Sequence, residues 1–122
     1  MIKLITLLTR KPGLSREEFI DYYEANHRVI GEKYLSGYAV KYQRRFLCGL
    51  EGAILEGGEP PFDVLMEIWF PDQATFDRAM AHLQTPEAQA EILADEEKLF
   101  DRDKMRSFTV EEYESELPPL PA

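Results

Sequence analysis

Residues 62–70, Phe-Asp-Val-Leu-Met-Glu-Ile-Trp-Phe, decide the fold of this chain. Every second side chain from Phe62 to Phe70 is apolar, which is the period of a β-strand with one buried face. The opposite face carries Asp63, Leu65, Glu67 and Trp69. Because Leu65 and Trp69 are large and apolar, we predict that this second face is also covered, as an interface or a binding groove.

A well-specified helix start precedes this strand. Ser15 is followed by Glu18 at the spacing of a capping box, in which each residue satisfies a free backbone N–H of the other. Leu14 and Phe19 can form the hydrophobic staple around this cap. We predict a helix that ends at Gly31, a natural left-handed cap. One face of this helix carries Phe19, Tyr23, His27 and Ile30.

Three further strands and two further helices complete the predicted set of elements. The strands are expected at residues 2–9, 39–47 and 104–110. One helix follows the N-cap Asp72, and the next has Pro86 at its first position. Residues 49–61, rich in glycine and proline, predict a long loop of a kind that is often functional.

The order strand, helix, strand, strand, helices, strand is the split βαβ arrangement. We therefore predict an α+β, ferredoxin-like fold in which helices cover one face of an antiparallel sheet. One domain is expected over residues 1–113, followed by an extended, Pro-rich tail over 114–122. The open sheet face, with Leu65 and Trp69, predicts a homodimer that pairs through this face.

Composition argues against several partners. The 122 residues include 14 Lys and Arg against 23 Asp and Glu, and the net charge of −9 disfavours nucleic acid and anionic membranes. No apolar run approaches the roughly 20 residues that span a bilayer. The N-terminus lacks a signal-peptide pattern, so we expect a cytoplasmic protein without nucleic-acid or membrane partners.

Several segments together resemble the EthD-like family of dimeric α+β barrel proteins. They are residues 9–19 with Tyr22, Tyr23 and His27, the strand 62–70, and Ala94-Asp95-Glu96 with Phe100 and the final strand. One departure is that the family usually has a proline shortly after the histidine, whereas here the run is His27-Arg28-Val29-Ile30. Without the proline, the helix is expected to continue past His27 and to re-aim its imidazole.

The resemblance has implications for fold and activity. It implies a ferredoxin-like domain whose sheet faces that of a partner subunit, forming a barrel with a cavity. Family members are tied to the degradation of ethers and other organic compounds. Relatives in the wider superfamily are dehydratases, cyclases, isomerases, decarboxylases or cofactor-free oxygenases that act on aromatic and polyketide-like substrates.

His27 is the first candidate catalytic residue. Histidine changes charge near neutral pH without help, which suits proton transfer. The alternative is a structural histidine that packs beside Tyr23 or caps carbonyl groups near the helix end. We predict that His27 moves a proton next to a carbonyl and that Asp63 orients it. Tyr23 or Tyr42 would then hold the carbonyl oxygen.

Two carboxylates of the strand 62–70 have different expected roles. Asp63 and Glu67 lie about 13 Å apart at normal strand rise, too far for a glycosidase pair, which needs about 5–9 Å. A carboxylate on the cavity wall would be partly desolvated, which is compatible with catalysis for Asp63. Glu67 is instead expected to pair with Lys41 or Arg45 across the sheet.

The remaining predicted ligand contacts line the cavity. The predicted substrate-binding set is Tyr22, Tyr42, Leu65, Glu67 and Trp69. Tyrosine hydroxyls can donate to a carbonyl or enolate, and Trp69 can stack on an aromatic ligand. The alternative for each of these aromatic residues is a place in the core or at an interface.

Nothing in the sequence predicts a cofactor or a metal. Two histidines and one cysteine without close spacing disfavour a zinc or iron site. The glycine pairs lack the lysine and the helix that a phosphate-binding loop requires. Cys48 is expected to be a buried packing residue, and His82, which lies off the apolar stripe of its helix, a solvated surface residue.

The sequence therefore predicts a cofactor-free acid–base enzyme acting on a small apolar aromatic or polyketide-like molecule. The outcome would be dehydration, isomerisation or carbon–carbon cleavage. One alternative is a cofactor-independent oxygenase or an auxiliary component of an oxidative degradation pathway. Another is a non-catalytic binding protein for a hydrophobic metabolite.

Overall fold

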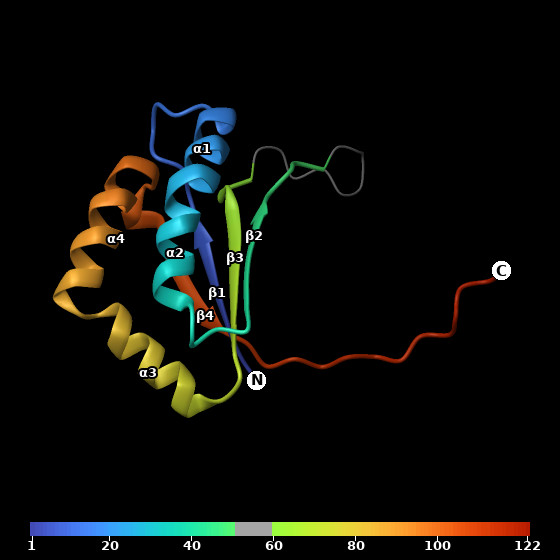
Figure 1. Cartoon of the computed structure of the whole chain (residues 1–122). Helices are drawn as coiled ribbons and strands as arrows, with labels where there is room; N and C mark the ends of the chain where they lie inside the picture. The colour runs from blue at the N-terminus through green and yellow to red at the C-terminus, as the bar shows by residue number, and fades with distance from the viewer. Residues whose placement is uncertain (51–59) are drawn as a thin grey trace.

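The computed structural model describes residues 1–50 and 60–122, and these form a four-stranded antiparallel sheet (Figure 1). Its strands are β1 (Ile2–Leu8), β2 (Lys41–Phe46), β3 (Val64–Phe70) and β4 (Arg106–Thr109). They lie in the order β2-β3-β1-β4, so β3 and β1 are central. This arrangement confirms the α+β, split βαβ fold.

The helices all lie on one side of the sheet (Figure 1). They are α1 (Arg16–Tyr22), the π-helix η1 (Tyr23–His27), α2 (Arg28–Leu35), α3 (Gln73–Leu83), α4 (Pro86–Leu99) and the short 3-10 helix η2 (Arg102–Lys104). The other face of the sheet, called the open face below, carries no helix of the described chain.

The predicted helix starts are confirmed by individual hydrogen bonds. The Ser15 hydroxyl accepts from the Glu18 backbone N–H at 3.1 Å, and the Glu18 carboxylate accepts from the Ser15 N–H at 3.0 Å. Asp72 caps α3 by accepting from the Thr75 N–H at 2.8 Å. These bonds satisfy backbone donors that have no partner within the helix, which is why the starts are readable in the sequence.

The core lies between the sheet and the helices. Its largest fully buried side chains are Tyr23, Phe19, Phe70, Leu99 and Val64. On β3, Val64, Ile68 and Phe70 point toward the helices, as the alternation of this strand predicted. Leu65, Glu67 and Trp69 alternate with them and therefore belong to the open face.

The predicted end of the first helix at Gly31 is wrong. The helical path continues through α2 to Leu35, and the glycine with a left-handed backbone is Gly37, at φ +89°. Gly31 serves packing instead, because a Cβ at this position would lie 2.7 Å from the Tyr42 hydroxyl oxygen. The C-cap residue of α2 is Ser36, and the close approach of Tyr42 to Gly31 depends on tertiary packing.

The ends of the chain segments differ modestly from expectation. The described strands are shorter at their ends than predicted, as is usual for element boundaries. Most of the expected loop 49–61 lies outside the described residues.

Beyond Thr109 the chain has no helix or strand and runs away from the body (Figure 1). Within residues 1–50 and 60–122, no helix has the length and apolar character to cross a membrane.

Candidate functional site

A buried histidine–carboxylate pair joins the first helical run to α4. His27 Nδ1 lies 2.9 Å from Asp95 Oδ2, and the other carboxylate oxygen accepts from the Tyr22 hydroxyl at 2.5 Å. The side chains of His27 and Asp95 are only 12% and 9% exposed. Since a carboxylate accepts hydrogen bonds, Asp95 selects the tautomer in which Nδ1 carries the proton, leaving the Nε2 lone pair for an external proton.

The π-helix η1 brings Tyr22 and His27 to the same carboxylate. Residues five apart in an α-helix are turned by about 140° around the axis, so they do not share a partner. In η1 the backbone N–H of Arg28 bonds the carbonyl of Tyr23, five residues back, which widens the turn. Such single π turns are frequent at functional sites. The continuation past His27 expected from the missing proline is thus present, with a local change of helix type.

The imidazole of His27 lies in an aromatic environment. Its ring meets Tyr23 edge-on at 5.3 Å and Phe100 at 5.2 Å between centroids. Burial lowers the pKa of His27, and the bond to Asp95 only partly opposes this effect. No described residue bonds Nε2, yet no buried side-chain nitrogen or oxygen in this part of the chain lacks a partner, so Nε2 retains contact with solvent. The ring is therefore neutral near pH 7, with an accessible basic nitrogen.

The hydroxyls near His27 hold their protons firmly. Hydrogen bonding to Asp95 raises the pKa of Tyr22 to about 12. Burial, followed by its interaction with Tyr42, raises the pKa of Tyr23 well above the ordinary value. Burial also raises the pKa of Tyr42. All three tyrosines keep their hydroxyl protons at neutral pH, but Tyr22 donates its proton to Asp95 and Tyr23 donates its proton to Met66 Sδ, which leaves Tyr42 as the donor for a ligand oxygen.

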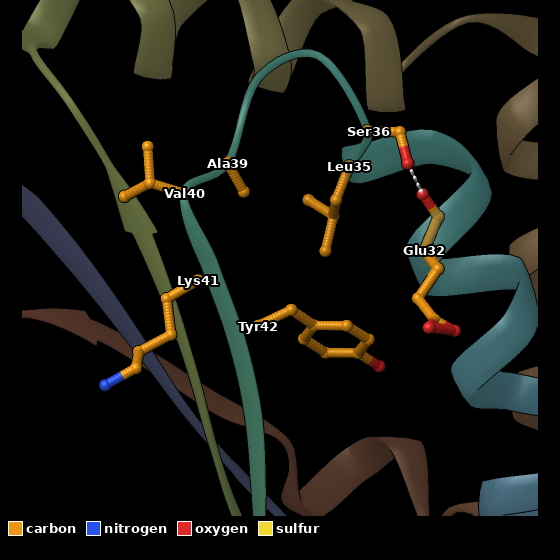
Figure 2. A pocket seen from close by; sticks show the side chains of 7 residues that line it. All are labelled: Glu32, Leu35, Ser36, Ala39, Val40, Lys41 and Tyr42. Carbon is orange, nitrogen blue, oxygen red and sulfur yellow. Dashed lines mark hydrogen bonds between the residues drawn. The ribbon is translucent and has the colours of Figure 1, made fainter.

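Tyr42 connects this cluster to a pocket between α2 and β2. The pocket has a volume of about 160 Å³ and is lined by Glu32, Leu35, Ser36, Ala39, Val40, Lys41 and Tyr42. In Figure 2, Leu35 and Tyr42 point toward each other across the hollow, while Lys41 points away beyond β2. The Arg44 guanidinium lies over the Tyr42 ring, with Cζ 4.8 Å from the ring centroid. The wall is thus mainly apolar, with one phenol hydroxyl.

Asp63 lies elsewhere and does not orient His27. Its Oδ2 accepts from the Arg10 backbone N–H at 2.8 Å, and its Oδ1 lies 3.6 Å from Arg10 Nε. Asp63 precedes β3 at the turn where β1 ends, whereas the carboxylate beside His27 comes from α4. The expected pairing of Asp63 with His27 is therefore corrected to Asp95.

The other predicted ligand contacts lie on the open face. Leu65 and Glu67 pair in register with Arg45 and Gln43 of β2, away from the helices. Trp69 lies between two ammonium groups, with Lys3 Nζ at 3.9 Å and Lys41 Nζ at 4.2 Å from its ring. Because one sheet layer separates Trp69 from the helix side, the predicted site is divided between two faces.

Glu67 has the pairing expected for it. Its carboxylate accepts from the Trp69 indole N–H at 2.9 Å and lies 3.5 Å from Arg45 Nη2. Burial favours a higher pKa for Glu67, but the Trp69 and Arg45 interactions outweigh it, and the net pKa is lowered. Glu67 is therefore a charged member of an open-face network.

Sequence reasoning gave no role to Asp95, the central acceptor of the site. The signal was present, because Ala88, Asp95 and Leu99 occupy one buried stripe of α4. An acidic side chain on a core stripe is rare and requires a partner. What the sequence lacked was the identity of that partner, which only the packing of α4 against η1 reveals.

Two further expectations about reactive side chains are wrong. Cys48 is exposed, with its sulfur 3.4 Å from Arg16 Nη2, because it follows the end of β2 instead of lying within it. His82 is partly buried, stacked on Tyr38 at 5.1 Å and tilted against Tyr34 at 5.8 Å. Within residues 1–50 and 60–122, no group of three or more His, Cys, Asp or Glu side chains could hold a metal ion.

The fold and the site define a small α+β domain with a carboxylate-oriented histidine between its helices. A family model described as the EthD domain matches residues 11–103, well over half of the chain. This protein therefore belongs to the EthD family, as the resemblance in its sequence indicated. A comparison with curated proteins found no match.

Solved structures with the same fold include other members of this family. An EthD family protein from Bacillus halodurans C-125 is 18% identical, with a TM-score of 0.60 over 93% of this chain and 100% of its own. An EthD-like protein from Ralstonia eutropha JMP134 is also 18% identical, at 0.61 over 89% and 86%. A dimeric ferredoxin-like protein of unknown function from Thermobifida fusca YX is 14% identical, at 0.59 over 89% and 88%. These matches establish the ferredoxin-like fold.

Proposed function

We propose that this protein is a cofactor-free acid–base catalyst for a small, apolar, oxygen-bearing molecule. The observation that carries this proposal is the 2.9 Å bond between His27 Nδ1 and Asp95 Oδ2 in a site with little water. A carboxylate that holds the tautomer of a histidine is the usual device for making the other ring nitrogen a directed general base.

The proposed mechanism assigns one step to each group. The neutral Nε2 of His27 removes a proton from carbon next to a carbonyl, and Asp95 stabilises the imidazolium that forms. The hydroxyl of Tyr42, on the wall of the α2–β2 pocket, would then donate to the enolate oxygen of a substrate that reaches both Tyr42 and His27. Return of the proton from the His27 imidazolium to another carbon gives isomerisation, and its transfer to a departing β-hydroxyl gives dehydration with release of water. For carbon–carbon cleavage, Nε2 would instead take the proton of a β-hydroxyl, and the bond between the α and β carbons would break to leave a carbonyl and an enolate.

The proposal is tested by hydrogen–deuterium exchange, which needs no knowledge of the natural substrate. Aryl ketones and β-diketones would be incubated with the protein in D₂O, and loss of the α-proton signal followed by NMR. The wild type should accelerate exchange, His27→Gln should abolish the acceleration, and His82→Gln, the matched histidine control, should retain it. Equal acceleration by wild type and His27→Gln would contradict the proposal.

A second candidate is a binding protein for a hydrophobic metabolite, and the α2–β2 pocket favours it. Its volume of about 160 Å³ suits one aromatic ring, since a cavity of roughly 150 Å³ holds benzene. Phenol would be titrated into the isotope-labelled protein, with Leu35 and Ala39 as NMR reporters. Saturable shifts that persist in His27→Gln, without exchange of any ketone, would favour binding over catalysis.

We further propose that a second copy covers the open face. Apolar side chains from three strands lie there: Ile5, Leu7, Leu65 and Phe108, the last 51% exposed. A solved structure of similar fold from Bacteroides fragilis, like the one from Thermobifida fusca, is described as dimeric. Native mass spectrometry should give a dimer, and a monomer at micromolar concentration would contradict this proposal.

A further inference from the structure

Residues 111–122, called the arm below, are extended and separate from the body of the protein. Every residue of the arm is exposed, including Tyr113 at 95%, Leu117 at 82% and Leu120 at 91%. In Figure 1 the arm runs away from the helical layer and beyond the sheet. Three large apolar side chains in such a segment have no cover within the described chain, and exposed apolar groups of this kind mark a contact surface.

The start of the arm is fixed to the open face. Lys3 Nζ lies 2.8 Å from Glu112 Oε1, and Lys3 stands opposite Trp69 in the register of β1 and β3. Since Trp69 belongs to the open face, the arm leaves the body on that side. The arm therefore begins where it could contact a molecule seated on the open face.

The chemistry of the arm fits a second copy of this chain. Its acidic residues are Glu111, Glu112, Glu114 and Glu116. The edge strand β2 presents the exposed basic side chains Lys41 and Arg45 beside the exposed Val40. Within its own chain Lys41 lies over Trp69 and Arg45 lies 3.5 Å from Glu67, and both still expose part of their surface to a partner. An acidic, apolar arm and a basic, apolar edge are complementary in both respects. Three prolines in the arm, Pro118, Pro119 and Pro121, restrict its backbone and reduce the entropy lost on docking.

We propose that the arm of each subunit lies across the second copy, along the partner's edge strand β2. Twelve extended residues reach at most about 40 Å, enough to cross a domain of this size. Glu114 and Glu116 would face Lys41 and Arg45 of the partner subunit, and Leu117 and Leu120 would cover the apolar surface beside them. This inference rests on the proposed dimer but concerns a separate set of contacts.

Photo-cross-linking of the full chain tests the arm directly. Leu117 would be replaced by p-benzoylphenylalanine, and Ala90, on the exposed side of α4, would carry the same group as a control. Irradiation should join two chains only from position 117, and the cross-linked peptide should come from the β2 region. A dimer by native mass spectrometry without this cross-link would overturn the proposed arm contact but not the proposed dimer. A monomeric wild type would overturn both proposals.

Removal and charge reversal provide a second test. Deleting residues 111–122 should raise the dimer dissociation constant at least about tenfold, measured by sedimentation, with the unfolding transition of the domain retained. The double variant Glu114→Lys, Glu116→Lys should weaken the dimer, and combining it with Lys41→Glu should restore affinity. Arg45 is left unchanged because it lies 3.5 Å from Glu67 in its own chain. An unchanged dissociation constant on deletion, or no recovery in the combined variant, would overturn the proposal.

Discussion

The two faces of the sheet differ in what surrounds the polar side chains that lie over them. On the helix side, Asp95 receives hydrogen bonds from both His27 and Tyr22, and no buried side-chain nitrogen or oxygen of residues 1–50 and 60–122 lacks a partner. On the open face, Trp69 lies between Lys3 and Lys41, within reach of water in the single chain. The helix side therefore satisfies its buried polar groups within one chain, whereas the open face leaves an aromatic and charged network partly exposed, as the proposed second copy would require.

The largest expected effect compares two phenylalanines on opposite faces. Phe70 is 0% exposed and Phe108 is 51% exposed. Phe70→Ala should lower the free energy of unfolding by about 3–5 kcal/mol, because a fully buried ring leaves a cavity. Phe108→Ala should cost less than about 1 kcal/mol in the dissociated chain and should instead weaken the dimer. Urea unfolding at low and high protein concentration measures both, and equal losses in dilute protein would break the comparison.

Asp95→Asn should remove about 1–3 kcal/mol of stability, since a buried donor loses its charged acceptor. NMR titration should also show a His27 pKa below that of the wild type, because Asp95 raises it against burial. Burial holds the His27 pKa below 6.5, so protonation of His27 lowers the free energy of unfolding as pH falls below about 6.5. Asp95→Asn should lose more of this free energy than the wild type over the same pH range. An unchanged or higher His27 pKa would contradict this assignment.

Gly31→Ala sharpens the account of the helix-side packing. Alanine favours the helix by about 1 kcal/mol, but its Cβ would lie 2.7 Å from the Tyr42 hydroxyl oxygen and 2.9 Å from the ring. We expect a net loss of about 1–2 kcal/mol as Tyr42 shifts. Thermal unfolding of Gly31→Ala with and without Tyr42→Leu checks this, because removing the ring should restore stability. A Gly31→Ala variant more stable than the wild type would contradict this expectation and show that the Tyr42 side chain moves away at little cost.

The smallest expected effects compare neighbouring arginines of β2. Arg44 faces the helices and donates to both oxygens of Glu24, at 2.7 and 3.0 Å, while Arg45 faces the open side and lies 3.5 Å from Glu67. Arg44→Gln should cost about 1–2 kcal/mol, because bidentate charge-assisted bonds are lost. Arg45→Gln should cost under about 0.5 kcal/mol. Chemical unfolding of both variants measures the difference, and the reverse order would contradict the assignment of faces.

The elements that the sequence predicted best are those with local causes. The capping box at Ser15 and Glu18 acts through bonds three residues apart, so it is legible without tertiary information. The alternation of residues 62–70 likewise assigns Val64 and Ile68 to one face and Leu65 and Trp69 to the other. The prediction that the helix ends at Gly31 failed because Gly31 packs against Tyr42, a tertiary contact that no local pattern records.

The candidate site was only half predictable for the same reason. His27 and the tyrosines were identifiable from their side-chain chemistry and their shared helix face. The sequence by itself thus determined the element order, the faces of the strands, the acidic charge and the candidate base. Only the tertiary structure decided that His27 meets Asp95 instead of Asp63, and that Trp69 lies across the sheet from both. Those pairings depend on how α4 packs against η1, a contact between residues 68 positions apart in the chain, which no local sequence pattern records.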